Sequence, residues 1–352
     1  MAEHRSPLLD LPGAVPAPAP DQAIAWHYGD PLGEQHRPAS LLDLSNRDVL
    51  VVPGPDRLAW LHAICSQHVA ELADGESSQA LVLSPNGHVE QHWQLTELEG
   101  QVWLDTEPAA AEQVLAYLLK MRFMKRVEPA IVDYALLAVA GPNAETVLTE
   151  AELPVPTDRA LALPAGGFVR RANDRFEIMT GRDGLAKLAE RLIAAGARPM
   201  GSWAAAALRV VQRRPRLGLD TDHRTLAHEA GWIGSAVHLD KGCYRGQETV
   251  ARVQNLGKPP RRLVLLQLSG DSEQLPAPGS PVERDGRPVG FVGTAVQHYE
   301  LGPIALAIVK RTLSPADRLS VDGHAAMLDP ADAEANLPTG FAGRIGPAQT
   351  SA

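Results

Sequence analysis

Two stretches of this 352-residue chain repeat one order of structural signals, and this repeat restricts the fold more than any other feature. In residues 48–61 and 134–148, aliphatic and β-branched residues lead through Gly-Pro-Asp or Gly-Pro-Asn into apolar residues at helical spacing. Residues 175–188 form a looser third copy. Strand, turn and helix in this order predict an α+β body, with Asp56 and Asn143 placed to cap the helices. Such a turn is also a common connection from strand to helix, so a chance similarity stays open.

The rest of the chain adds strand signals and one further helix. Pro85-Asn86-Gly87 is a turn between two β-patterned arms, which predicts a hairpin. A third strand is expected in residues 101–107, and a helix over 109–120. After Gly257, strand-like runs are separated by Asp-Gly and Gly-Pro turns, with almost no helical pattern. Residues 259 to about 330 therefore predict a small all-β domain, a sandwich or a barrel.

The two ends of the chain have compositions that predict little packing. Residues 12–20 are a Pro/Ala run, so residues 1–22 are expected to form a disordered arm. The Gly-, Ala- and Pro-rich residues 331–352 predict a flexible tail. Between the ends we expect an α+β body of two sub-domains over 23–257 and a β domain over 258–330.

Charge and cysteine content narrow the classes of function. The chain carries 42 acidic and 33 basic side chains, a net charge of −9, which disfavours an extended nucleic-acid surface. No long apolar run and no export signal are present, so we expect a cytoplasmic monomer without membrane contact. Two cysteines cannot build a disulfide framework or a four-cysteine metal centre, and no zinc-type histidine motif occurs, so no metal site is predicted.

The densest chemical signal lies at residues 241–248. Gly242 and Gly246 predict a tight loop, and Lys241 and Arg245 flank a cysteine within it. Positive charge favours a thiolate, so these residues predict a lowered pKa and a reactive thiol. The eight residues are Lys241, Gly242, Cys243, Tyr244, Arg245, Gly246, Gln247 and Glu248.

Other residues of this segment are expected to support the thiol. Gln247 and Glu248 are placed to hydrogen-bond the backbone of the loop. Cys65, by contrast, falls on an apolar helical stripe with Trp60 and Leu61 and is expected in the core. A glycine turn that happens to contain a cysteine remains the alternative interpretation of the motif.

The segment KGCYRGQETVAR resembles the KGCYxGQE signature of the folate-binding YgfZ family, which is related to the T-protein (aminomethyltransferase) of the glycine cleavage system. The resemblance extends over roughly residues 25–330. The further similar stretches are 27–35, 43–75, 136–148, 208–220 and 287–309.

The resemblance implies a fold, a cofactor and a function. The implied fold has two intertwined α+β domains and a C-terminal β domain around a central cavity that holds tetrahydrofolate or a one-carbon derivative. The implied function is that of an accessory protein that supports the assembly or repair of iron–sulfur clusters, including those of tRNA-thiolating enzymes. Its implied partners are iron–sulfur proteins or their assembly machinery. Cys243 would act beside the folate, on a one-carbon unit, sulfur, iron or a client protein.

The resemblance also suggests which residues bind folate. The pterin-recognising glutamate of the family falls on Glu229, whose carboxylate can accept two parallel N–H bonds. Gln91 is expected to face the folate, and the same resemblance places Trp203, Arg209 and Tyr244 in the folate site.

A cluster of four cations could serve the glutamate tail of folate, although such a run is often only a solvated face. Its members are Lys120, Arg122, Lys125 and Arg126.

Two departures from the aminomethyltransferase pattern bear on activity. Gln91 stands where those enzymes carry an aspartate, and an amide cannot act as a carboxylate base. Val211 occupies a position at which they carry an acid. Strand alternation predicts that Glu90 faces away from Gln91. The sequence thus favours folate binding without transfer, and the alternative is a one-carbon transferase that uses Glu90 or His92 as a variant base.

Overall fold

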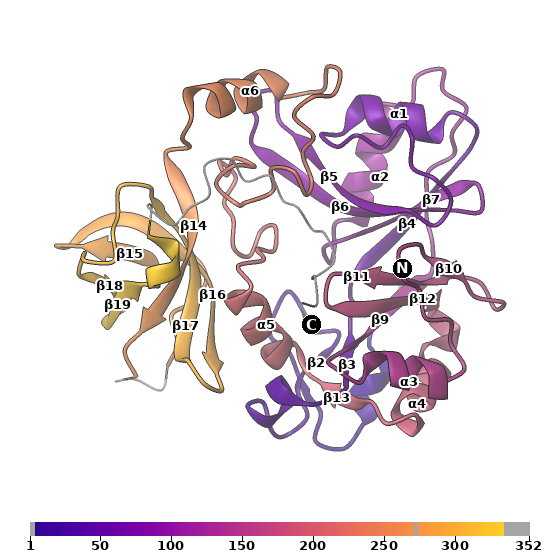
Figure 1. Ribbon diagram of the computed structural model, residues 1–352, viewed down its shortest axis with the longest axis horizontal. Helices are drawn as coiled ribbons and strands as arrows, with labels where there is room; N and C mark the ends of the chain where they lie inside the picture. Colours follow the sequence, from indigo (N-terminus) through magenta and orange to yellow (C-terminus); the bar gives the residue numbers. More distant parts are fainter. Residues whose placement is uncertain (1–3, 271–273, 334–352) are drawn as a thin grey trace, which may run out of the picture.

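The computed structural model describes residues 4–270 and 274–333, which form a ring of two α+β domains and a β-barrel (Figure 1). This is the expected fold class. None of the helices in these two ranges is long and apolar enough to cross a membrane.

The first domain is a five-stranded sheet with two helices packed on one face. Its core joins Trp93 and Leu95 of the sheet to Trp60 and Leu118 of the helices. The strand order is β5-β6-β7-β4-β8. The elements are β4 (Asp48–Pro53), α1 (Arg57–Ile64), β5 (Ser77–Leu83), β6 (Val89–Leu98), β7 (Gln101–Thr106), α2 (Ala111–Lys120) and β8 (Ala130–Ile131).

The second domain is a six-stranded sheet in the order β10-β11-β12-β9-β3-β13. Its strand β3 (Ser40–Asp43) precedes the whole first domain in sequence yet pairs with β9 (Tyr134–Ala140), so the two domains are intertwined. The other elements are α3 (Ala144–Glu150), β10 (Leu161–Ala162), β11 (Phe168–Ala172), β12 (Arg175–Gly181), α4 (Leu185–Ala194) and β13 (Arg198–Met200).

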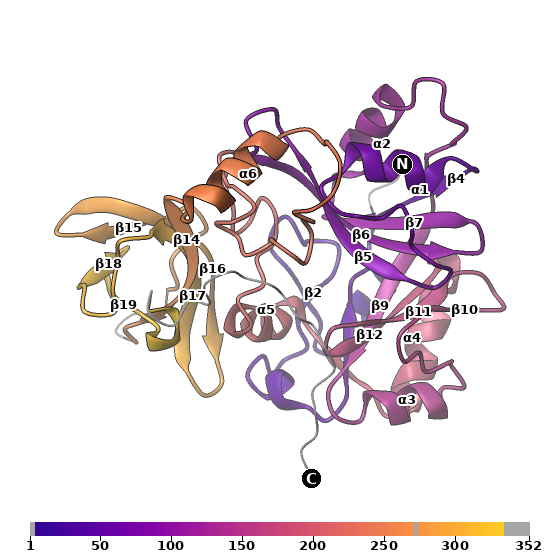
Figure 2. The ribbon, with the colours of Figure 1, turned by 45° about the horizontal axis from the view of Figure 1, so that its top comes forward.

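A closed six-stranded barrel completes the ring. Its strand order is β14-β17-β16-β15-β18-β19. Helix α5 (Ser202–Val211) lies between the barrel and the second sheet, and α6 (Gln247–Leu256) leads into the barrel (Figures 1 and 2). The strands are β14 (Arg261–Leu268), β15 (Pro281–Arg284), β16 (Arg287–His298), β17 (Gly302–Lys310), β18 (Leu319–Val321) and β19 (His324–Leu328).

The expectation of a disordered N-terminal arm is wrong for residues 4–22. Leu8 is buried in the core of the second domain. Strand β1 (Val15–Pro16) pairs with β2 (Ala25–His27). The Asp21 carboxylate forms an ion pair with Arg216 at 2.6 Å. Composition could not predict these contacts, because each of them involves a residue that is distant in sequence.

Residues 331–333 do not fit the expectation of a flexible tail. Asp332 is buried and pairs with Arg213 at 2.7 Å. Residues 334–352 of that predicted tail lie outside the described residues.

The three strand–turn–helix units occur as β4–α1, β9–α3 and β12–α4, but the expected caps do not form. Asp56 and Asn143 occupy the N-cap positions without a side-chain bond to the helix. The Asp56 carboxylate instead accepts from the backbone and guanidinium of Arg126, at 2.8 and 3.0 Å. A distant cation has displaced the local contact that the sequence favours.

Candidate functional site

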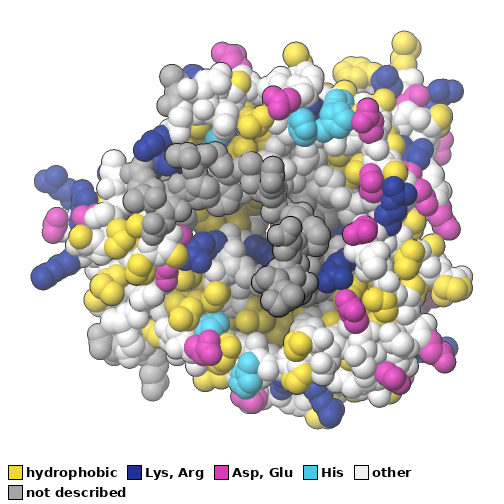
Figure 3. Space-filling model, viewed as in Figure 1, with side chains coloured by type: hydrophobic (Ala, Val, Ile, Leu, Met, Phe, Trp, Pro, Cys, Tyr) yellow, Lys and Arg dark blue, Asp and Glu magenta, His cyan; other side chains and the backbone are white. Residues whose placement is uncertain are grey.

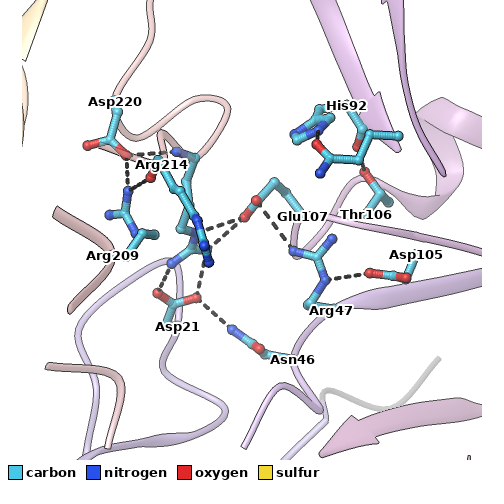
Figure 4. A network of polar contacts seen from close by, with 12 residues as sticks. Asp21, Asn46, Arg47, His92, Asp105, Thr106, Glu107, Arg209, Arg214 and Asp220 are labelled. Carbon is cyan, nitrogen blue, oxygen red and sulfur yellow. Dashed lines mark hydrogen bonds and ion pairs between the residues drawn. The ribbon is translucent and has the colours of Figure 1, made fainter. Parts of the chain in front are cut away.

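The ring is hollowed at its centre, and Lys and Arg side chains face the hollow (Figure 3). A chain of alternating charges crosses this region (Figure 4). Arg216 pairs with Asp21 and with Glu107, at 2.6 and 2.8 Å. Arg47 pairs with Asp105 at 2.8 Å and also contacts Glu107. Burial opposes the ionisation of Glu107, but the charges of Arg216 and Arg47 outweigh it and lower its pKa.

His92 lies on the same side as this network (Figure 4). Its ring is 4.9 Å from that of Trp232, and its Nε2 is 3.0 Å from the side-chain oxygen of Gln79. Burial lowers the pKa of His92 to about 4, so the imidazole is neutral at physiological pH. A neutral imidazole beside an indole can bind a planar polar ring or accept a proton.

Gln91 does not face the hollow, and the expectation that it does is wrong. Its side-chain oxygen accepts from the indole N–H of Trp93 at 3.0 Å, on the face covered by α1 and α2. The side chains of β6 alternate as predicted, but Gln91 lies on the core face and not on the face toward the hollow. Trp93 and Leu95, two and four residues on, were the signal that odd-numbered positions of β6 belong to the core.

Glu90 lies at the start of β6 and pairs with Arg245 at 2.9 Å. Both side chains are more than one-third exposed. Glu90 is therefore held by the cation of the loop that carries Cys243.

The loop that carries Cys243 is clamped by close backbone contacts. Gly246 has φ = +82°, and a Cβ there would meet the carbonyl oxygen of Ser84 at 2.6 Å. The hairpin turn thus docks directly on the start of α6. Gln247 donates its amide to the carbonyl of Lys241 at 3.1 Å, as the sequence predicted. Cys243 is exposed on this fixed loop.

Glu248 and Gly242 make smaller contributions. Glu248 is exposed in the first turn of α6, where the helix dipole stabilises a carboxylate. Among the described residues its side chain forms no hydrogen bond to the loop. A Cβ at Gly242 would have no heavy atom within 4 Å, and the φ of this residue is not left-handed. Of the two glycines that flank Cys243, Gly246 is the one that its surroundings require.

Lys241 does not face the thiol, and this corrects the expected electrostatics. Its ammonium donates to the carbonyls of His62, Cys65 and Gln67 at the end of α1, the latter two at 2.7 and 3.1 Å. Burial lowers the pKa of Lys241. Since Arg245 is engaged by Glu90, both expected activators have acceptors of their own, and neither hydrogen-bonds to the Cys243 thiol within the described residues.

Cys65 is a core residue, as expected. It is 1% exposed at the end of α1, and burial raises the pKa of its thiol. Tyr244 is also buried, in an apolar cluster with Trp232, and its hydroxyl has no protein partner in the described part of the chain. Burial raises the pKa of Tyr244 to about 12, so it remains a neutral donor.

Glu229 is engaged by a residue that the sequence did not single out. Arg261, at the start of β14, donates to both oxygens of Glu229 at 2.9 and 2.8 Å, and Leu226 N–H adds a third bond at 3.0 Å. The Glu229 side chain is 1% exposed. Arg261 also holds Asp222 at 2.8 Å. A ligand at Glu229 would compete with this cation.

Trp203 and Arg209 hold α5 in place. Trp203 stacks on Trp26 with ring centroids 4.7 Å apart. Arg209 donates to Asp220 and Thr294, each at 2.6 Å. Both predicted folate residues thus have structural contacts between the barrel and the α+β body.

The four-cation cluster Lys120, Arg122, Lys125 and Arg126 is separated from the rest of the site. Arg126 pairs with Asp56 at the start of α1, whereas Lys241 contacts the carbonyls at its end. The cluster follows α2, which covers the sheet face opposite His92. The structure therefore does not bring it to the central hollow, and its expected service to a folate tail there is not supported.

Parts of this architecture match known protein domains. The GCVT N-terminal domain matches residues 34–160, and the CAF17 C-terminal beta-barrel domain matches 261–334. An aminomethyltransferase of Geobacillus kaustophilus is 31% identical over 300 residues, which cover 80% of this chain and 81% of that protein. The chain belongs to the aminomethyltransferase family.

Two further proteins are similar to this chain, one in fold and one in sequence over part of its length. The crystal structure of glycine cleavage system aminomethyltransferase T from Bartonella henselae superposes with a TM-score of 0.81 at 22% identity, and covers 91% of this chain and 94% of that one. It confirms the T-protein-like fold. An Arabidopsis thaliana protein named as a putative chloroplastic transferase is 26% identical over 71% of this chain, which spans 60% of that protein's length.

The β5–β6 hairpin differs from the aminomethyltransferase pattern that the sequence resemblance implies. The position at which the sequence comparison expects an aspartate carries Gln91, which packs beside Trp93. The neighbouring acid, Glu90, is paired with Arg245. The hairpin therefore offers the imidazole of His92 to the side that bears the charge network, whereas the Glu90 carboxylate is paired and the Gln91 amide lies on the other face.

Proposed function

We propose that this member of the aminomethyltransferase family is a YgfZ-type accessory protein, which binds a reduced folate and uses Cys243 to support iron–sulfur enzymes rather than to transfer an aminomethyl group. The observation that carries the proposal is the exposed Cys243 on a loop fixed by Gly246 and Gln247. The match to the CAF17 barrel supports this branch of the family.

A fixed, exposed thiol suits work on a partner molecule. Loop residues on a rigid support are the usual carriers of function, and an exposed thiol can meet a sulfur, iron or protein substrate without any opening of the core. The buried Lys241 ammonium secures the loop to the end of α1 and so keeps the thiol in one place. Presentation, rather than activation by Lys241 and Arg245, is the role that these contacts support.

Tetrahydrofolate is the cofactor that the family implies, and its fit to the chain's own residues is partial. The unpartnered hydroxyl of Tyr244 and the neutral His92 beside Trp232 offer a donor and planar surfaces. Glu229 would accept from the pterin only by sharing its carboxylate with Arg261. We therefore assign folate recognition first to His92 and Tyr244, and keep Glu229 as a residue to be tested.

A folate-dependent one-carbon transferase is the second candidate. It is favoured by the 31% identity to an aminomethyltransferase and by the neutral imidazole of His92, which could act as a variant base. Turnover of an aminomethyl or methylamine donor in the presence of tetrahydrofolate separates the two candidates. Turnover that depends on His92 would establish the transferase.

The test of the accessory function compares folate binding with activity in cells. Cys243→Ser should leave tetrahydrofolate affinity within about twofold of the wild type while iron–sulfur enzyme activity falls in cells that depend on the protein. Glu229→Gln is compared with Asp222→Asn, because both remove a carboxylate from Arg261. If Glu229 binds the pterin, its variant alone weakens affinity by about tenfold. A fully active Cys243→Ser protein would refute the proposal.

A further inference from the structure

The turn after α2 projects from the surface and has an apolar tip. Phe123 is 81% exposed and Met124 is 96% exposed, whereas most large apolar side chains of the described chain are buried. Phe123 has φ = +45°, which is unusual for an aromatic residue. The N–H of Lys125 closes the turn on the carbonyl of Arg122 at 2.9 Å. Backbone strain of this kind persists only where the surroundings enforce it.

Both ends of the turn are anchored to α1. The indole N–H of Trp60 donates to the carbonyl of Met121 at 2.8 Å. Arg126 is held by Asp56 through its backbone and its guanidinium. The backbone on both sides of the tip is therefore held in place, which reduces the entropy lost when a partner binds.

Three cations surround the apolar tip and form no ion pair with an acid among the described residues. They are Lys120, Arg122 and Lys125. At the upper right of Figure 3, over α1 and α2, Lys and Arg side chains stand beside hydrophobic ones. In a chain with a net charge of −9, this is a local reversal of sign, and it favours an acidic partner.

A hollow of about 460 Å³ adjoins the tip. Residues Pro53–Pro55 form one side of it, Arg122, Lys125 and Arg126 form the other, and Val127 and Glu128 complete its lining. Gly54 has φ = +119°, and the backbone of Arg126 leaves no room there for a Cβ, so the floor of the hollow is closely packed. Three cations and a single acid, Glu128, line the hollow, and this excess of positive charge suits a carboxylate. The adjacent phenylalanine and methionine suit an apolar side chain.

We propose that this surface, the basic tip (residues 119–126 with Pro53–Pro55), docks an acidic peptide segment of a partner protein that carries an apolar residue beside its carboxylates. An anionic membrane is disfavoured because two apolar side chains give weak insertion and the chain as a whole is negative. RNA is disfavoured because a short cluster does not make a groove that tracks several phosphates.

The probe is a displayed library of random peptides of about twelve residues, selected on the full wild-type chain. Peptides that combine Asp or Glu with an aromatic or aliphatic residue should be enriched. Phe123→Gly with Met124→Ser removes the apolar contact and is tolerated by the backbone, because glycine accepts a positive φ. Synthetic selected peptides should bind this variant about tenfold more weakly, as measured by fluorescence anisotropy.

Charge reversal tests the other half of the surface. Lys120→Glu with Lys125→Glu should weaken the same peptides by about tenfold, with weaker binding at high salt. Lys187→Glu on α4 and Met327→Ser on β19 are matched exposed controls and should have little effect.

The surface is independent of the proposed folate and thiol function. Tip variants should retain tetrahydrofolate affinity and Cys243 alkylation, so either proposal can fail alone. The docking proposal would be overturned if the enriched peptides lacked acidic residues. It would also be overturned if they bound the tip variants as tightly as the wild-type chain. Tip-dependent binding to phosphatidylserine vesicles or to an oligouridine, with no peptide selected, would overturn it as well.

Discussion

At the scale of single residues, Gly246 is the position on which the Cys243 loop depends. Its φ of +82° and the carbonyl of Ser84 leave no space for a side chain. Gly246→Ala should therefore destabilise the protein by about 2 kcal/mol or more. Gly242→Ala is the control, since no neighbour lies within 4 Å and its φ is not left-handed, and it should be neutral within about 1 kcal/mol. Denaturant midpoints measure both, and equal losses would contradict this account.

Lys241 is the second residue whose role can be isolated. Lys241→Met leaves the carbonyls at the end of α1 without their donor, and should cost about 2 kcal/mol or more in unfolding free energy. Arg245→Met breaks only an exposed pair and should cost less than about 1 kcal/mol. Chemical denaturation gives both values. A Lys241→Met protein of wild-type stability whose Cys243 alkylates many times more slowly would restore the idea that Lys241 activates the thiol.

At the scale of elements, β6 shows what periodicity can and cannot supply. The turn residues predicted the hairpin, and strand alternation predicted that neighbouring side chains of β6 lie on opposite faces, since both depend on neighbours in the chain. Gln91 does not face the hollow, although the family resemblance predicts it there, because Gln91 lies on the same face of β6 as the core residue Trp93. The contacts of Glu229 with Arg261, and of Asp56 with Arg126, were equally invisible, because ion pairs between distant residues leave no local pattern.

His92, on the face of β6 toward the hollow, should make the stability of the protein depend on pH. The pKa of His92 is about 4 in the folded protein and near 6.5 when unfolded. As the pH falls below 6.5, the unfolded chain therefore binds this proton first, so the contribution to stability is complete above pH 6.5 and is lost toward pH 4. The loss should be roughly 2 kcal/mol, less than the full shift implies because the side chain is only half-buried. His92→Gln should flatten the stability curve in this window, and an unchanged slope would contradict the assignment.

At the scale of the whole molecule, the ring is held by contacts between segments far apart in sequence. Arg216 joins Asp21 of the N-terminal segment to Glu107 of the first domain, and Leu8 enters the core of the second. The N-terminal segment thus contacts two parts of the ring, and no local sequence pattern predicts these contacts. The same Pro/Ala run that suggested an arm lies between these two anchors.

Those anchors make residues 4–22 necessary for stability. Leu8→Ala should cost about 2 to 4 kcal/mol because it leaves a cavity beside the second sheet. Asp21→Asn should cost about 1 to 3 kcal/mol, since Arg216 keeps Glu107 but loses a bidentate carboxylate. Asp10→Asn is the control and should change little, because the Asp10 carboxylate is exposed and forms an exposed ion pair with Arg5. Thermal and denaturant unfolding of the full chain measure all three. If the Leu8 and Asp21 variants were as stable as the control, the segment would contribute nothing to the ring, because neither its burial nor its ion pair would then outweigh the entropy lost in ordering it.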